Sequence, residues 1–107
     1  MQALCLTCGH VFQMRKSEEE LAKPRQCRLC WSYSIIKRKE VEDLADEVAR
    51  LIRHGQSMPF LDAIERAIAH RAFKRFGFFE TIRLLRVVRF MAEEGLSFEE
   101  AVEIVFG

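Results

Sequence analysis

Four cysteines in two closely spaced pairs are the residues of this sequence whose spacing most directly predicts chemistry. Cys5 and Cys8 form one Cys-x-x-Cys pair, Cys27 and Cys30 form the other, and 18 residues separate them. Two thiolates on one tight turn can bind the same cation, and two such turns complete a tetrahedron. The spacing therefore predicts one structural zinc ion bound by all four cysteines. Such a closed site leaves no position for water, which argues against catalysis by the metal.

The alternative, that the cysteines form disulfides or stay free, depends on the cellular compartment. Residues 1–4 run directly into the first cysteine pair, so we expect no signal peptide. The longest apolar stretches are far shorter than the roughly 20 residues that a membrane span needs. We therefore expect a cytoplasmic protein, in which thiols stay reduced and paired Cys-x-x-Cys motifs bind metal more often than they form disulfides.

The residues around the cysteines carry a family resemblance. The segment from Cys8 to Arg15 reads Cys-Gly-His-Val-Phe-Gln-Met-Arg, Pro24 precedes the second pair, and Ser32 follows it. Over residues 3–38 this pattern resembles the zinc ribbons of small archaeal DNA-binding and transcription-associated proteins. The resemblance implies a ribbon fold for this segment. It also implies a function in nucleic-acid binding or, since ribbons serve as docking modules too, in binding other proteins.

The second cysteine pair departs from that pattern. Arg28 stands where the family usually has proline, Trp31 stands where a small residue is common, and the loop between the pairs is longer. A rubredoxin-like iron site shares both knuckles but usually has glycine at the position of Trp31, so zinc is favoured. His10 is a candidate ligand, but with four cysteines in place we expect it to pack or to lie on the ribbon surface.

Beyond the cysteines, the hydrophobic pattern of this 107-residue chain predicts one small globular protein. Short apolar runs near residues 4–6, 11–14 and 33–36 predict the strands of the ribbon, and the capping-box match at 17–20 predicts a helical turn. Helical spacing predicts helices over about 39–54, from Pro59 toward Gly77, and over about 78–94. A second capping box at 97–100 opens a short last helix. We therefore predict a zinc ribbon over residues 1–38 and an all-α bundle of about four helices over 39–107.

The helix ends and inward faces are predicted in more detail. Gly55, Gly77 and Gly95 each follow a helical pattern, where a left-handed C-cap residue belongs. The second helix is expected to turn one apolar set inward: Phe60, Leu61, Ile64, Ile68 and Phe73. The third helix is expected to bury one arc of apolar residues: Leu84, Leu85, Val87, Val88, Met91 and Ala92.

The opposite arc of the third helix is unusual because arginines alternate with apolar residues there: Arg83, Arg86 and Arg89 with Phe79, Ile82 and Phe90. Three interpretations stay open. The arginines can bind phosphates while the aromatics stack on bases, or the same set can form a protein interface. In the third interpretation, neighbouring helices bury the apolar residues and the arginines pair with the acidic first helix or the Glu-rich C-terminus.

Charge is segregated along the chain although the net charge is only +1. Residues 1–38 hold seven Lys or Arg and three Glu, and residues 66–89 hold seven Lys or Arg and one Glu. The other two segments, 39–65 and 90–107, are acidic. Two basic blocks can together present one positive surface to a polyanion. The predicted nucleic-acid-binding residues are Arg15, Lys16, Arg25, Arg28, Lys37, Arg38, Arg71, Lys74, Arg75, Arg83, Arg86 and Arg89.

The leading hypothesis is thus a zinc-stabilised protein that binds nucleic acid or acts as a transcription-associated adaptor. The alternative is a protein-interaction module, either a homodimer or a subunit of a larger complex, that docks through the helical Arg and Phe residues. Trp31 and Tyr33 either form a stacking platform or cover the small ribbon. No pattern of nucleophile, base and phosphate loop is present, so we expect neither an enzyme nor a small-molecule substrate.

Overall fold

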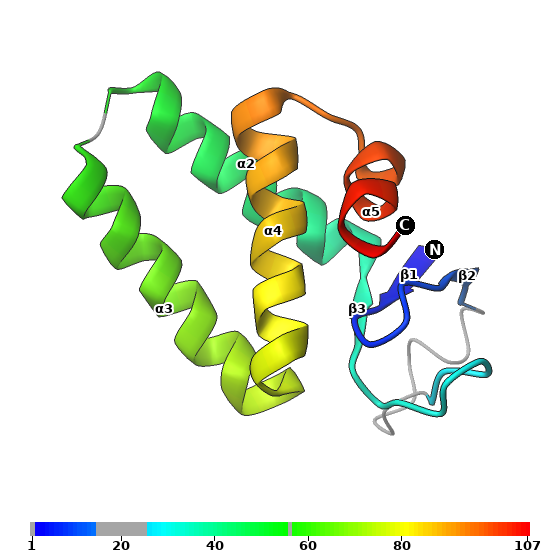
Figure 1. The fold of residues 1–107 in the computed structure, drawn as a ribbon. Coiled ribbons are helices and arrows are strands. Elements are labelled where there is room, and N and C mark those ends of the chain that lie inside the picture. Colours follow the sequence, from blue (N-terminus) through cyan, green and yellow to red (C-terminus); the bar gives the residue numbers. More distant parts are fainter. Residues whose placement is uncertain (1, 15–25, 56) are drawn as a thin grey trace.

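A small sheet followed by four helices makes up the computed structural model, which describes residues 2–14, 26–55 and 57–107 (Figure 1). The strands are β1 (Gln2–Cys5), β2 (Val11–Gln13) and β3 (Ile35–Lys37). The helices are α2 (Arg38–Arg53), α3 (Met58–Phe76), α4 (Phe78–Glu94) and α5 (Phe98–Phe106). Strand β1 is central and pairs antiparallel with both neighbours, so Leu4 lies between Val11 and Ile36. The predicted fold class, short strands followed by a helical bundle, is confirmed.

The helix ends follow largely from local chemistry. Gly55 after α2 and Gly95 after α4 both have φ of +68°, as a left-handed cap requires. Gly77 differs from the prediction, since its ψ of 177° makes an extended link from α3 directly into α4. The capping box of α5 is confirmed: the Ser97 hydroxyl accepts from the Glu100 amide and the Glu100 carboxylate accepts from the Ser97 amide. No helix in the described ranges is long and apolar enough to cross a membrane.

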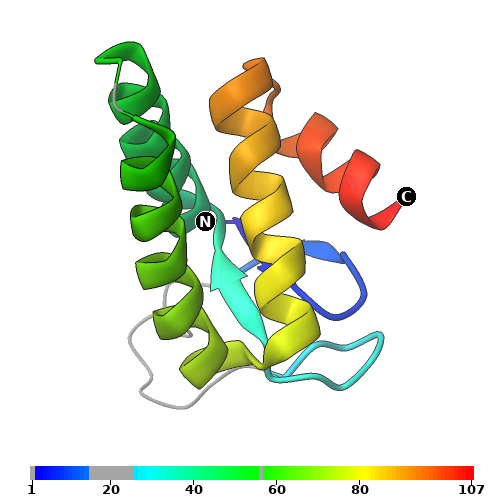
Figure 2. The same ribbon diagram turned by 60° about the vertical axis from the view of Figure 1, so that its left-hand side comes forward.

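Helix α4 is the centre of the fold. It packs against α2, α3 and α5, and Figure 2 shows it standing between the α2–α3 pair and α5. One face of α4 is fully buried: Thr81, Leu84, Val87 and Val88. Leu85, Met91 and Ala92 pack against this core while partly exposed. The predicted core arc of this helix is therefore confirmed.

Helix α3 differs from the prediction at one position. Ile68 is buried as expected, but Phe73 is 54% exposed, and Ala72 and Phe76 take its place in the core. Residues 68, 72 and 76 follow one another at a spacing of four along one side of the helix, which turns residue 73 away from that side. The predicted role of Phe60 concerns a side chain outside the described part of the protein. The remaining inward residues of this helix are partly buried: Leu61 and Ile64.

The ribbon and the helices share one hydrophobic core. Leu4, Leu6 and Ile36 belong to the same buried cluster as the inner faces of α2 to α5, and Phe98 of α5 is among its largest fully buried side chains. A three-stranded sheet of this size encloses little apolar volume of its own, so it depends on the helices for its burial, and its strands β1 and β3 lie against α2. The division into domains at residue 38 stays a prediction.

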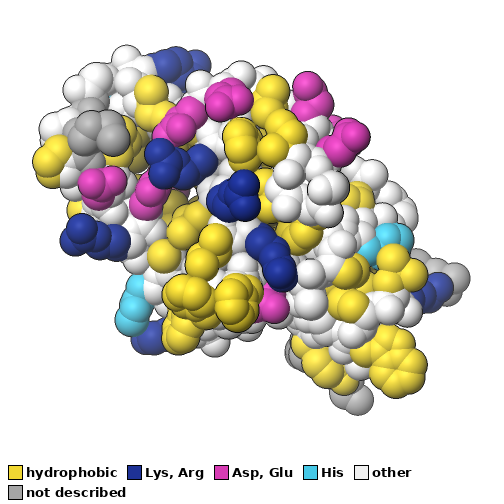
Figure 3. All heavy atoms as spheres, viewed as in Figure 1, with side chains coloured by type: hydrophobic (Ala, Val, Ile, Leu, Met, Phe, Trp, Pro, Cys, Tyr) yellow, Lys and Arg dark blue, Asp and Glu magenta, His cyan; other side chains and the backbone are white. Residues whose placement is uncertain are grey.

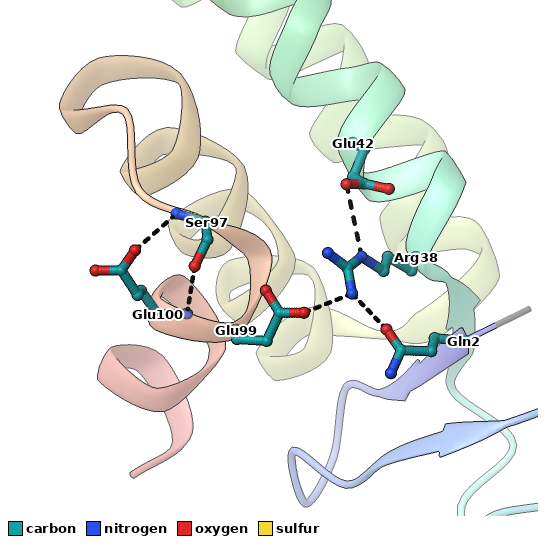
Figure 4. A network of polar contacts seen from close by, with 6 residues as sticks. All are labelled: Gln2, Arg38, Glu42, Ser97, Glu99 and Glu100. Atoms are coloured by element: carbon teal, nitrogen blue, oxygen red, sulfur yellow. Dashed lines mark hydrogen bonds and ion pairs between the residues drawn. The ribbon is translucent and has the colours of Figure 1, made fainter.

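Arg38 connects three elements at the end of this shared core (Figure 4). From the first turn of α2, its guanidinium donates to Gln2 of β1 and to Glu99 of α5, the latter at 2.6 Å. It also pairs with Glu42 at 3.5 Å and lies 4.9 Å from the centroid of the Phe98 ring. One side chain therefore links the last helix to the first strand, beside the buried core contacts of α5.

Candidate metal centre and its surroundings

The four cysteine sulfurs converge on one point. All lie within 4.8 Å of one another; Cys5 Sγ is 3.5 Å from Cys30 Sγ, and Cys8 Sγ is 3.6 Å from Cys27 Sγ. A disulfide requires about 2.05 Å, so these cysteines are free thiols rather than two bridges. Metal–sulfur bonds of about 2.3 Å in a tetrahedron place the sulfurs about 3.8 Å apart. The four cysteines are positioned to coordinate one metal ion, as a zinc-ribbon-like segment requires.

The two cysteine knuckles repeat one backbone pattern. In the first, the Gly9 amide donates to the Cys5 carbonyl and the Cys5 amide donates to the His10 carbonyl, both at 2.9 Å. In the second, the Trp31 amide donates to the Cys27 carbonyl at 2.9 Å, and the Cys27 amide donates to the Ser32 carbonyl at 2.8 Å. The knuckles thus match residue for residue, and Gly9 and Trp31 occupy equivalent positions.

These turns also tune the thiols. Burial raises the pKa of the Cys5 thiol to about 12, against the opposing effect of the Cys8 and Thr7 amides. Burial acts in the same direction on Cys27, but hydrogen bonds from the Cys30 and Leu29 amides outweigh it and lower its pKa to about 7. Backbone amides that point at sulfur stabilise the thiolate, which is the form that binds metal. The amides of the second knuckle therefore favour the thiolate form of Cys27.

Gly9 and Trp31 share a left-handed backbone but differ in surroundings. Gly9 has φ of +82°, and a Cβ there would lie 2.5 Å from Phe106 Cβ, so only glycine fits beneath the last helix. Trp31 has φ of +64°, the only positive φ of a non-glycine residue in the described ranges, and its side chain is 72% exposed. A bulky residue in this conformation is strained. The second knuckle thus keeps an exposed indole where the first has glycine.

His10 is not part of the sulfur cluster. Its ring stacks on Phe12 with a centroid distance of 5.6 Å and an interplanar angle of 22°. The prediction that it packs on the ribbon rather than binding the metal agrees with this position.

Helix α4 is hydrogen-bonded to the cysteine knuckles through side chains near its N-terminus. Arg83 donates from Nη1 to the carbonyls of Leu6 and Thr7, at 3.2 and 3.1 Å. The Thr7 hydroxyl hydrogen-bonds to the Ser32 hydroxyl at 2.8 Å and to the Glu80 carboxylate at 3.2 Å. These contacts join both knuckles to the first turns of α4. Sequence patterns gave no sign of them, since Arg83 and Glu80 lie more than 70 residues from Thr7.

Four predicted nucleic-acid-binding residues have partners within the protein. Besides Arg38 and Arg83, Arg75 donates to Glu40 at 2.6 Å, and Arg89 pairs with Glu65 at 3.3 Å and with Glu93 at 3.0 Å. These carboxylates stabilise the charged guanidinium and raise the pKa of Arg89, mainly through the hydrogen bond to Glu93. Of the three arginines on the α4 arc, Arg89 alone has acidic partners among the described residues, and these lie in α3 and in α4 itself rather than in α2 or α5. The α2 pairing is made instead by Arg75 of α3.

The other predicted basic residues are placed differently. Five have no hydrogen bond or ion pair to the part of the chain that the structure describes: Arg28, Lys37, Arg71, Lys74 and Arg86. Three others, together with the predicted capping box at 17–20, lie outside the described residues: Arg15, Lys16 and Arg25. Whether these residues bind nucleic acid stays a prediction.

Large apolar side chains gather on the surface at one end of the molecule, over the lower ends of α3 and α4 and on the ribbon (Figure 3). Trp31 and Tyr33, 72% and 61% exposed, lie on the second knuckle and its exit, so they do not cover the ribbon. At the α3–α4 corner, Phe78 makes edge contacts with both Phe73 and Phe79. Neighbouring helices therefore do not bury Phe79, although Phe90 does pack against the core.

No protein-family model matches this chain, and neither a curated protein nor a solved structure matches it. The function has to be argued from the site itself.

Replacing Cys30 by Ser tests the metal centre. With three thiolates left, we expect metal affinity to fall by more than about 100-fold, because losing only an outer-shell partner costs about 10–100-fold. Titration with Co²⁺, read through the visible bands of a tetrahedral thiolate site, measures this loss. The exposed ribbon residue Gln13, replaced by Ala, is the control and should keep one metal per chain. Equal cobalt binding by Cys30→Ser and the parent protein would contradict a four-cysteine site.

Proposed function

We propose that this chain is a zinc-stabilised adaptor without an active site of its own, which binds single-stranded nucleic acid through its second cysteine knuckle. The observation that carries the proposal is the exposure of Trp31 and Tyr33 beside the metal-binding residues. The metal then has a structural role: it fixes the backbone that presents these aromatic rings.

Zinc is the metal that the donor set supports best. Four thiolates in a tetrahedral arrangement suit zinc or an iron centre, and sites closed by four cysteines are typical of structural zinc. In protein purified from cells supplied with both metals, we expect elemental analysis to give one zinc per chain and a colourless sample. A red, redox-active sample with one iron per chain would overturn this part of the proposal.

The position of Trp31 supports a role in binding rather than in folding. Its backbone conformation is one that glycine adopts without cost, as Gly9 does in the matching knuckle. The indole is not buried, so packing does not compensate for the strain. Strained residues persist where function requires the side chain. Aromatic side chains stack on bases with a gain of about 1–3 kcal/mol per base.

Charge around the knuckles also supports a polyanionic partner. The described ribbon residues, 2–14 and 26–38, contain no Asp or Glu. Arg28 lies on the knuckle itself, and Lys37 lies at the end of β3. Neither forms an ion pair with the described residues, so no pair within that part of the chain has to break before they contact phosphates.

Replacing Trp31 by Gly separates binding from stability. The change relieves the left-handed strain, so we expect the free energy of unfolding to rise by about 1 kcal/mol. We also expect affinity for labelled single-stranded RNA or DNA to fall about 10-fold through lost stacking. Fluorescence anisotropy across a salt series measures the affinity, and chemical denaturation of the zinc-loaded protein measures the stability.

Trp31→Phe is the matched control, since it keeps an aromatic ring and should keep most of the binding. Trp31 is the only tryptophan in the chain, so its own fluorescence should be quenched when bases stack on it. Absence of binding by the parent protein at low salt would exclude the nucleic-acid function. Binding that Trp31→Gly leaves unchanged would exclude this knuckle as its site.

A second candidate function, a protein-interaction module, is favoured by one specific observation. Phe73, Phe78 and Phe79 are all more than half exposed at the α3–α4 corner, where Phe78 contacts the other two rings. Ile82 extends this apolar surface along α4. Exposed aromatic clusters are typical of protein interfaces. A homodimer is the simplest assembly that such a surface can make.

Light scattering tests the homodimer. If copies of the chain associate through this corner, the parent protein should be a dimer at high concentration, and Phe79→Ser should shift it toward the monomer by at least about 10-fold in dissociation constant. Ile104→Ser is the control, because Ile104 is a similarly exposed apolar residue on α5. A monomer at every concentration would exclude self-association.

A further inference from the structure

A cavity of about 270 Å³ opens between α2 and α3, and none of the four cysteines lines it. Its floor belongs to the shared core and includes Ile36, Ala72 and Leu84. Cavities of roughly 150 Å³ with apolar walls already accept benzene, so this one has room for a larger apolar group.

The arrangement of the helices explains why the cavity exists. Helix α4 packs against both α2 and α3, whereas these two diverge from their connection toward the ends that carry Glu40 and Arg75 (Figure 1). Several residues of α3 line the gap, and one of them is Ala72, whose methyl group leaves space unfilled. An empty apolar cavity costs stability, whereas a bound apolar group would recover that loss.

The mouth of the cavity carries three charged residues. Arg75 donates to Glu40 at 2.6 Å and its guanidinium stacks 4.6 Å from the centroid of the Phe76 ring, so it is held in place and its charge is balanced. Arg71 also lines the mouth, is exposed, and has no hydrogen bond or ion pair to the described residues. The mouth thus offers one uncompensated guanidinium beside an apolar floor.

We propose that this cavity binds a small amphiphilic carboxylate, with an aliphatic or aromatic tail of about six to eight carbon atoms. The tail packs on Ile36, Ala72 and Leu84, and the carboxylate accepts hydrogen bonds from Arg71. A guanidinium binds a carboxylate through two parallel hydrogen bonds, which gives the mouth its preference for an anionic head over a neutral one. This site is independent of the nucleic-acid function proposed for the ribbon.

Titration of the ¹⁵N-labelled, zinc-loaded protein with hexanoate and with 1-hexanol tests the site by NMR. We expect both to shift the amide signals of Ile36, Ala72 and Leu84, with hexanoate binding more tightly. Arg71→Gln should raise the dissociation constant of hexanoate about 10-fold and change that of 1-hexanol by less than about twofold. Glu40→Gln should have the opposite effect and lower the dissociation constant of hexanoate several-fold, because it removes a negative charge from the mouth.

Two further variants make the result decisive. Ala72→Leu fills the cavity and should abolish binding of both compounds, and its amide spectrum shows whether the fold is kept. Lys74→Gln removes the same charge from an exposed position of the same helix that does not line the cavity, and should change neither affinity. The proposal is overturned if neither compound shifts the lining residues, or if Arg71→Gln and Lys74→Gln weaken hexanoate equally.

Discussion

The convergence of four thiol groups from two separate turns is the constraint on which the rest of the ribbon depends. The three short strands enclose too little apolar volume to hold two knuckles in place by themselves. Their stability comes from the shared sulfur centre on one side and from the core around α4 on the other. Arg83 connects these two supports, because it reaches from the second turn of α4 to the carbonyls of Leu6 and Thr7 in the first knuckle. Loss of either support would therefore also strain the contacts that Arg83 makes with the other.

The parts of the fold that depend on local chemistry could be predicted from sequence. Cysteine spacing predicted the cluster of four sulfurs, and the helical period with its caps predicted the bounds of α4 and the start of α5. Prediction was less accurate where several faces of a long helix are apolar, as in α3, where Phe73 and Phe76 both fit the pattern and only packing against α4 selects one. Long-range polar contacts could not be predicted, because which carboxylate meets Arg75 or Arg89 depends on how the helices cross.

The distribution of charge illustrates the same limit. The sequence shows two basic and two acidic blocks, and their segregation alone indicates one positive surface. In the fold, several arginines instead make contacts within the protein. Arg38 joins three elements, Arg83 donates to the first knuckle, and Arg89 bridges α3 and α4. Basic blocks in a small protein can thus serve assembly as much as recognition. The aromatic side chains of Trp31 and Tyr33, by contrast, stay exposed beside the second knuckle.

The close approach of Gly9 to Phe106 links the choice of residue at two positions that are far apart in the sequence. A Cβ at position 9 would lie 2.5 Å from both Cβ and Cγ of Phe106. Any side chain at position 9 would therefore have to displace the Phe106 ring, and with it the last turn of α5. A mutation at position 9 would thus be tolerated only together with a smaller residue at position 106, so we expect the two positions to vary together.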